Sequence, residues 1–297
     1  MNLDINILHH IGLITSNMNI TIERYEKLGF SFTPLSLPRI PLKPGGELES
    51  LGVGNRCAIF QNNYLEVLGV VDKARWDTIT EAQRGPYDID KPLRRFEGLH
   101  VMHFGADDLE AVHKRLIEQG TSCSDIKPFQ RIVDTPDGKK MMHAKTVHFP
   151  ENANPEGLIQ IAQHVTPELV LQPRYMQHAN GAKTIIEIIV CTTNPSEYAA
   201  KYERYSGHKS EQKGSSYILN LGYSSVRVIS PENMGDILPG RLPPALPFLA
   251  GFTVAVTDLH TTRNVLTDNQ IPFVDNGERL IVRSEDACGS AVLFVNE

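Results

Sequence analysis

Residues 7–29 read ILHHIGLITSNMNITIERYEKLG, and this stretch contains the signals of one strand followed directly by one helix. The apolar and β-branched run at 7–15 predicts a strand, and the Ser-Asn pair at 16–17 is typical of a helix N-cap. At 18–28 the apolar side chains recur at helical spacing, and Gly29 is a common helix end. The stretch therefore predicts a strand, a cap, a helix and a closing glycine.

The same order of strand, cap, helix and closing glycine or asparagine begins again near residues 99, 184 and 252. Shorter strand-like runs follow each helix, so each repeat is interpreted as a β-α-β-β unit with room for a further strand. One such unit leaves a face of its sheet uncovered and has to pair with another unit. Four units in two pairs predict an α+β fold.

A length of 297 residues corresponds to about two domains at roughly 150 residues each. The segment 166–182 contains two prolines and an Asn-Gly pair and has little periodicity, which is typical of a linker. We therefore predict an N-terminal domain at 1–165 and a C-terminal domain at 183–297. Two long irregular stretches, 31–55 and 71–97, are interpreted either as lids over a site or as disordered insertions.

The composition argues against several classes of function. The 29 basic and 35 acidic residues leave a net charge of −6, and there is no basic run of the kind that binds nucleic acid. The four cysteines are scattered, as is typical of reduced thiols. The longest uncharged apolar segment, 242–256, is short and contains three prolines. We expect a soluble cytoplasmic protein with no nucleic-acid or membrane partner.

Several segments together resemble the vicinal oxygen chelate superfamily, which includes glyoxalases, extradiol dioxygenases and antibiotic-resistance proteins. The run HHIGLITSNMNITIERYEKLGF at 9–30 resembles its opening, and YLEVLGV at 64–70 resembles its ligand-bearing strand. GLHVMHFGADDLEAVHKRLIEQG at 98–120 resembles the start of its second module. GLIQIAQH at 157–164 and HANGAKTIIEIIV at 178–190 are similar to its glyoxalase-like branch. The resemblance implies four βαβββ modules that form two half-barrel cups, with a site inside a cup.

The resemblance also implies where metal ligands would lie, because the superfamily places His or Glu on four strands of a cup. The four positions correspond here to His10, Glu66, Val101 and Gln160. Two of these are strong metal ligands, one is a weak oxygen ligand, and Val101 is apolar. Because Val101 is apolar at a position where the superfamily has a metal ligand, both a metal site and a metal-free site remain as alternatives.

Strand alternation suggests a replacement for the missing ligand. If His10 faces the cup, His9 points the other way and has a structural or surface role. On the second opening strand Val101 and His103 share the cup face, so His103 is a substitute ligand displaced by two residues. A one-residue bulge would present His100 instead.

His10, Glu66 and His103 would form a set of two histidines and one carboxylate, which suits Fe(II), Mn, Ni or Zn. Such a metal acts as a Lewis acid on an enediolate, or binds a catecholate and O₂. Glu66 and His10 are the expected catalytic residues, and Glu66, or less effectively Gln160, is also suited to proton transfer.

The second half has lost these groups at the positions that the resemblance implies. Its first-strand position falls on Ile185, its module-opening position on Gly251, and its closing strand offers Leu293 or Phe294. Arg227 lies near the counterpart of Glu66. We interpret this half as a degenerate copy that supports the first cup, mediates assembly, or binds an anion through Arg227.

Two functions follow as alternatives. The first is a metal-dependent lyase, isomerase or dioxygenase that acts on a small oxygenated metabolite in the N-terminal cup. The second is a metal-free protein that binds a small molecule, with Val101 and Gln160 in the lining and Trp76 stacked on a planar ligand. A third hypothesis is a scaffolding or regulatory subunit. The protein is also a candidate for assembly as a homodimer.

Overall fold

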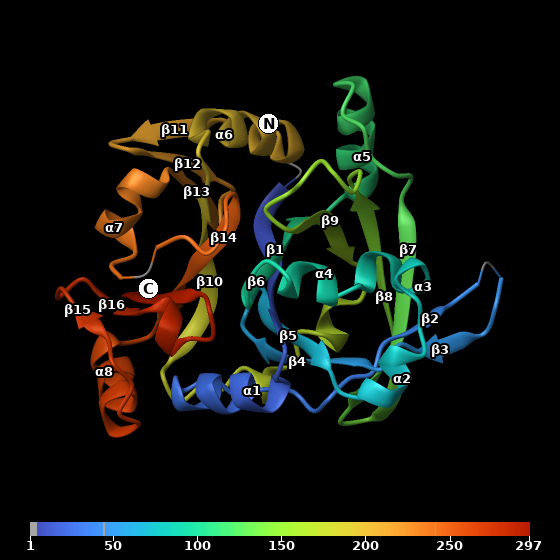
Figure 1. Ribbon diagram of the computed structural model, residues 1–297, viewed down its shortest axis with the longest axis horizontal. Coiled ribbons are helices and arrows are strands. Elements are labelled where there is room, and N and C mark those ends of the chain that lie inside the picture. Colours follow the sequence, from blue (N-terminus) through green and yellow to red (C-terminus); the bar gives the residue numbers. More distant parts are fainter. Residues whose placement is uncertain (1–4, 44, 241) are drawn as a thin grey trace.

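The computed structural model describes residues 5–43, 45–240 and 242–297, and their strands form two large curled sheets and one small hairpin. In Figure 1 the first half of the chain, blue to green, lies on the right, and the second half, gold to red, lies on the left. The first sheet is made by residues 5–164 and the second by residues 182–296. This arrangement confirms the mixed α+β fold with two cup-shaped sheets.

The first sheet has seven strands in the order β4-β5-β1-β6-β9-β8-β7. β1 lies at its centre, parallel to β5 and antiparallel to β6. The strands are β1 (Ile5–Thr15), β4 (Val53–Ile59), β5 (Tyr64–Val70), β6 (Gly98–Ala106), β7 (Lys127–Thr135), β8 (Gly138–His148) and β9 (Leu158–His164). The separate hairpin consists of β2 (Arg39–Pro41) and β3 (Leu48–Ser50).

The second sheet has eight strands in the order β11-β12-β13-β10-β14-β17-β16-β15. β10 takes the place of β1, because it is parallel to β13 and antiparallel to β14. The strands are β10 (Ala182–Cys191), β11 (Ser210–Lys213), β12 (Ser216–Asn220), β13 (Ser225–Ile229), β14 (Phe248–Val256), β15 (Val274–Asp275), β16 (Arg279–Val282) and β17 (Ala291–Asn296).

Each of the four repeats contains one long helix after its opening strand. These helices are α1 (Met18–Lys27), α5 (Leu109–Glu118), α6 (Pro195–Ser206) and α8 (Leu259–Asp268). The side chains of Asn17, Asp108 and Asp258 cap α1, α5 and α8 by accepting hydrogen bonds from first-turn amides. α6 ends at Gly207, whose φ of 78° lies in the left-handed region that glycine adopts freely.

Shorter helices cover the irregular stretches. They are α2 (Lys73–Asp77), α3 (Glu81–Arg84), α4 (Asp90–Leu93) and α7 (Met234–Ile237), with 3-10 turns η1 (Gly85–Tyr87), η2 (Pro167–Leu169), η3 (Pro173–Tyr175), η4 (Pro231–Asn233) and η5 (Ser284–Asp286). Residues 71–97, which the sequence left open as a lid or a disordered insertion, are therefore folded. Trp76, Ile79 and Ile89 of this stretch pack on Ile14 and Val53 of the first sheet.

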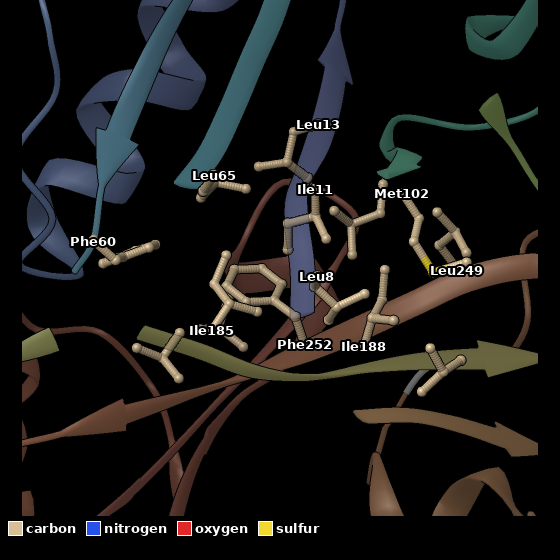
Figure 2. Packing of buried hydrophobic residues seen from close by; sticks show 14 of the residues in the cluster. Leu8, Ile11, Leu13, Phe60, Leu65, Met102, Ile185, Ile188, Leu249 and Phe252 are labelled. Atoms are coloured by element: carbon tan, nitrogen blue, oxygen red, sulfur yellow. The ribbon is translucent and has the colours of Figure 1, made fainter. Parts of the chain in front are cut away.

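The two sheets share one apolar core. Leu8 and Ile11 of β1 lie on the side of β10 and β14, near Ile188 and Phe252 (Figure 2), and Leu13 belongs to the same buried cluster. Burial of apolar side chains stabilises each contact by about 25 cal/mol per Å² removed from water. Because strand side chains alternate between faces, the opposite face of each sheet is the concave one. We call these concave faces the first cup and the second cup.

The segment predicted as a linker is packed against the first half. Val170 belongs to the apolar cluster that includes Tyr64 and Met142. The side-chain amide of Asn180 donates to the carbonyl of Leu28 at 2.9 Å. Because the two sheets share a core, the division into separate domains stays a prediction. None of the helices in the described part of the chain has the length and apolar character that membrane crossing requires.

Candidate functional site

A β-bulge in β1 turns two successive histidines into the first cup. Leu8 pairs with Phe104 and His10 pairs with His103, so His9 is an extra residue in β1. The two ring Nδ1 atoms of His9 and His10 lie 2.7 Å apart, one donating and the other accepting. The expectation that His9 points away from the cup is therefore wrong, because simple alternation does not hold across a bulge.

His10 stands in a row of polar side chains that crosses four strands. Tyr64, His10, His103 and Gln160 are opposite one another on β5, β1, β6 and β9. The His10 ring stacks on Tyr64 with centroids 4.6 Å apart, and the His103 ring lies 4.1 Å from it. The structure thus brings His10, His103 and Gln160 together in the first cup.

A fourth imidazole, His164 of β9, completes this group. Its ring centroid lies 4.0 Å from that of His9. We call His9, His10, His103 and His164 the histidine cluster. The alternation of Gln160, Ala162 and His164 along β9 places His164 on the cup face, and the same alternation in the sequence is the signal that indicates it.

Glu66 of β5 approaches the cluster from the neighbouring row of the sheet. Its Oε2 lies 3.9 Å from Nε2 of His10, and the amide of Asn55 donates to its Oε1 at 2.5 Å. Burial raises the pKa of Glu66, while the charge of Arg131 and the Asn55 hydrogen bond act in the opposite direction. Asn55 and Arg131 were not identified from the sequence, because their distance from Glu66 depends on how β4 and β7 pair.

Burial keeps the histidine cluster neutral. It lowers the pKa of His103 to about 3 and of His164 to about 4, and it lowers the pKa of His9 and His10 well below the usual value. Both ring nitrogens of His103, both of His164 and Nε2 of His9 are buried without a hydrogen-bond partner among the described residues. Unpaired buried polar atoms cost about 1–3 kcal/mol each, so this concentration of them makes the histidine cluster the candidate site.

The donor atoms suit a metal in kind, since neutral imidazoles and a carboxylate are ligands of first-row divalent metals. Their arrangement differs from that of a formed metal site. In the described part of the chain, no three His, Cys, Asp or Glu side chains are placed as a group that could hold a metal ion. His10 and Glu66 face one another at 3.9 Å, and the His103 ring lies beside His10 with centroids 4.1 Å apart.

Val101 and His100 do not supply the third ligand. Val101 lies opposite Gly12 on the neighbouring strand, and a Cβ on Gly12 would come within 2.8 Å of the Val101 Cβ, so the apolar Val101 side chain packs against the Gly12 backbone. A bulge does occur at His100, because Gly12 pairs with Val101 and Leu13 with Leu99. The His100 ring is nevertheless held elsewhere, with Nε2 2.8 Å from the carbonyl oxygen of Phe96.

Trp76 lies in the core of the segment 71–97. Its side chain is 1% exposed, and its indole N–H donates to Asp90 at 2.8 Å. The guanidinium of Arg84 covers the ring at 3.8 Å from its centroid. This placement leaves no ring face for a planar ligand, so Trp76 takes no part in the site that we propose.

The second cup has the same bulges and different residues. β10 has a bulge between Ile185 and Glu187, which matches the one between Leu8 and His10. Glu187, and not Ile185, therefore occupies the position of His10. Ile185 is fully buried in the shared core.

The register also locates the other counterparts in the second cup. Arg227 pairs with Ile189 as Glu66 pairs with Gly12, and Thr253 pairs with Glu187 as His103 pairs with His10. The Nε atom of Arg227 donates to Glu187 at 2.8 Å. An ion pair within the protein thus replaces the unpaired histidines.

A cavity of about 590 Å³ opens at the second cup, against residues 95–97 of the first half. Phe96, Met234, Leu238 and Phe248 are among its apolar lining residues, and neither Glu187 nor Arg227 lines it. The cavity is therefore separate from the counterpart of the histidine cluster.

The comparisons with known proteins agree with this geometry. Two cups, each with a polar row across its central strands, define a protein of the vicinal oxygen chelate fold. The glyoxalase-like domain family matches residues 8–206, and the chain belongs to this family. No significant match was found among curated proteins.

Solved structures show the same fold at low sequence identity. A hypothetical protein from Staphylococcus aureus is 13% identical, with a TM-score of 0.63, 98% of this chain covered and 99% of that chain. The Mn(II)-bound glyoxalase from Novosphingobium aromaticivorans is 10% identical, with a TM-score of 0.52 and coverages of 99% and 83%. An extradiol ring-cleaving dioxygenase from B. fuscum is 13% identical, with a TM-score of 0.54 and coverages of 99% and 72%.

Proposed function

We propose that the first cup is a divalent-metal site that acts on a small oxygenated metabolite, as a lyase, isomerase or dioxygenase. The observation that carries this proposal is the set of buried ring nitrogens without partners beside the Glu66 carboxylate. A purely structural core does not retain so many unpaired polar atoms. The Mn(II)-bound glyoxalase and the dioxygenase on the same fold give further support.

His10, Glu66 and His103 would hold the metal, which when bound polarises the substrate oxygens as a Lewis acid. His9 orients His10, because the contact between their Nδ1 atoms leaves Nε2 of His10 toward Glu66. Asn55 holds Oε1 of Glu66 and leaves Oε2 toward His10. In this arrangement Oε2 of Glu66 is also the atom that could accept or return a substrate proton.

Elemental analysis of the protein, purified without an affinity tag from medium supplied with Fe, Mn, Ni and Zn, tests the proposal. We expect about half an equivalent or more of one metal, and loss of that metal in H10A, E66Q and H103A. H260A, which removes an exposed histidine of α8, is the control and keeps the metal. Full metal content in H10A and H103A would contradict the proposed ligands.

A metal-free binding site is the second candidate. The apolar Val101 at the third ligand position and the absence of a three-ligand group among the described residues favour it. It predicts that small-molecule binding to the protein, followed by thermal shift, is the same with and without a strong chelator. A thermal shift that disappears with chelator would support the metal site instead.

A further inference from the structure

Arg131 brings a positive charge into the first cup. It lies on β7 opposite Met142 of β8, and Met142 is buried with Cys57 and Tyr64 in the cluster that lines this cup. Its neighbours in β7, Gln130 and Ile132, are exposed, whereas Arg131 itself is half-buried. Strand alternation therefore directs the Arg131 side chain inward.

A chain of hydrogen bonds connects the guanidinium to the proposed metal ligand. Nη1 of Arg131 donates to the hydroxyl of Ser36 at 3.0 Å. The backbone of Ser36 exchanges two hydrogen bonds of 2.9 Å with that of Asn55, whose side chain donates to Glu66. Arg131 on the edge strand β7 is thus connected to Glu66 on β5, near the other edge of the sheet.

Among the described residues the Arg131 guanidinium forms no ion pair, and the anion that acts on it from a longer distance is Glu66 of the same cup. Across the ranges that the structure describes, no carboxylate lies within ion-pair distance of Arg131, although sixteen other Lys, Arg or His side chains do have one. The only side-chain hydrogen bond of Arg131 among those residues is the one to Ser36. A guanidinium offers five N–H donors in a planar fork, and two parallel N–H groups match a carboxylate. The protein carries a net charge of −6, so a local cation is needed to attract an anion.

We propose that Arg131 selects the substrate of the first cup, and that this substrate is a small carboxylate. The carboxylate pairs with Arg131 and directs the oxygenated part of the molecule toward His10 and Glu66. This assignment rests on the proposed function, because it names the substrate class of the same cup. Arg131 binds the substrate, and we give it no part in holding the metal.

Matched acids and amides test the proposal on the full-length protein. The probes are lactate, pyruvate, benzoate and salicylate, each beside its primary amide, with binding measured by saturation-transfer NMR. We expect at least one acid to bind about tenfold or more tightly than its amide. R131Q should lose this preference, and R131K should keep part of it because the charge remains while the fork is lost. R263Q, which removes an arginine of α8, is the charge control and behaves as the wild type.

The outcomes separate this proposal from the proposed function. Metal content measured on the same variants should be unchanged in R131Q, since Arg131 is not a ligand. Acids and amides that bind equally well, or an acid preference that survives in R131Q, would overturn the role of Arg131 even if metal is present. Acid selectivity through Arg131 in a protein that holds no metal would uphold this proposal and contradict the metal-dependent function.

Discussion

Arg227 donates a 2.8 Å hydrogen bond to Glu187, and these residues occupy in the second cup the positions that Glu66 and His10 occupy in the first. In the first cup the corresponding pair is 3.9 Å apart and is surrounded by histidines without partners. The two cups therefore have the same strand register, and they differ in whether the polar side chains in that register have partners within the protein. The second cup satisfies its charges internally, whereas the first leaves donor atoms available to a ligand.

We expect the ion pair between Arg227 and Glu187 in the second cup to contribute to the free energy of unfolding. R227A leaves the largely buried Glu187 carboxylate without its partner and should lower the free energy of unfolding by about 1–3 kcal/mol. The double variant R227M/E187L should be less destabilised than R227A, because no charge is left unpaired. Urea unfolding of the three proteins measures both effects. Equal stability of R227A and the wild type would show that the pair contributes nothing.

Replacement of His103 should separate stability from metal binding. Leucine removes two buried nitrogens that have no partner in the described structure, so H103L with chelator should match the wild type or exceed it by about 1 kcal/mol. With metal added, only the wild type should gain thermal stability. Thermal unfolding with and without metal tests this. A metal-dependent gain in H103L as large as that of the wild type would remove His103 from the ligand set.

Glu156 joins the first half of the chain to α6. Its fully buried carboxylate accepts from Lys201 at 2.5 Å and from the Tyr202 hydroxyl at 2.7 Å. E156A should lower the free energy of unfolding by about 3–5 kcal/mol, because a buried ammonium loses its partner. E23A, which removes the exposed Lys27–Glu23 pair, should leave the free energy of unfolding nearly unchanged, because solvent screens an exposed ion pair. Similar losses in the two variants would contradict a special role for burial at Glu156.

We expect His100, which lies outside the histidine cluster, to make the free energy of unfolding depend on pH. Burial lowers its pKa to about 4, below the value near 6.5 of the unfolded chain, so the unfolded state binds more protons between these two values. Stability should therefore be constant above about pH 7 and fall as the pH drops from 6.5 toward 4, by on the order of 3 kcal/mol from this residue.

H100Q, which retains a side-chain donor for the Phe96 carbonyl but does not titrate, is the matched variant for this pH dependence. The stability difference between H100Q and the wild type should shift in favour of H100Q as the pH falls. Urea unfolding of both proteins at pH 8, 6 and 5 measures it. A difference that is independent of pH would contradict the prediction.

Much of the fold was predictable from local patterns. The strand, cap and helix order around Asn17 and Asp108 recurs in the structure, because a capping side chain acts within three residues of its own position. The placement of His10, His103 and Gln160 on one face was also predictable, since strand alternation is a local property. The shared core between β1 and β10 was not predictable, because it is formed by residues far apart in the chain.

It was not predictable that the His9 side chain points into the first cup, nor that Glu187 is the counterpart of His10. Both follow from a bulge, and a bulge is a property of how two strands pair rather than of either strand alone. Arg131 reaches the first cup because β7 closes the sheet at the edge opposite β4. Its separation from Glu66 in the sequence gave no indication of that approach.

The sequence by itself determined the repeated units, the pairing of those units and the polar character of the first half. These depend on spacing, capping and alternation, which act over a few residues. The tertiary structure alone decided which polar groups meet: the histidine cluster with Glu66 and Arg131 in one cup, and Arg227 with Glu187 in the other. Contacts of this kind depend on strand register and order, which are set by the packing of the whole sheet.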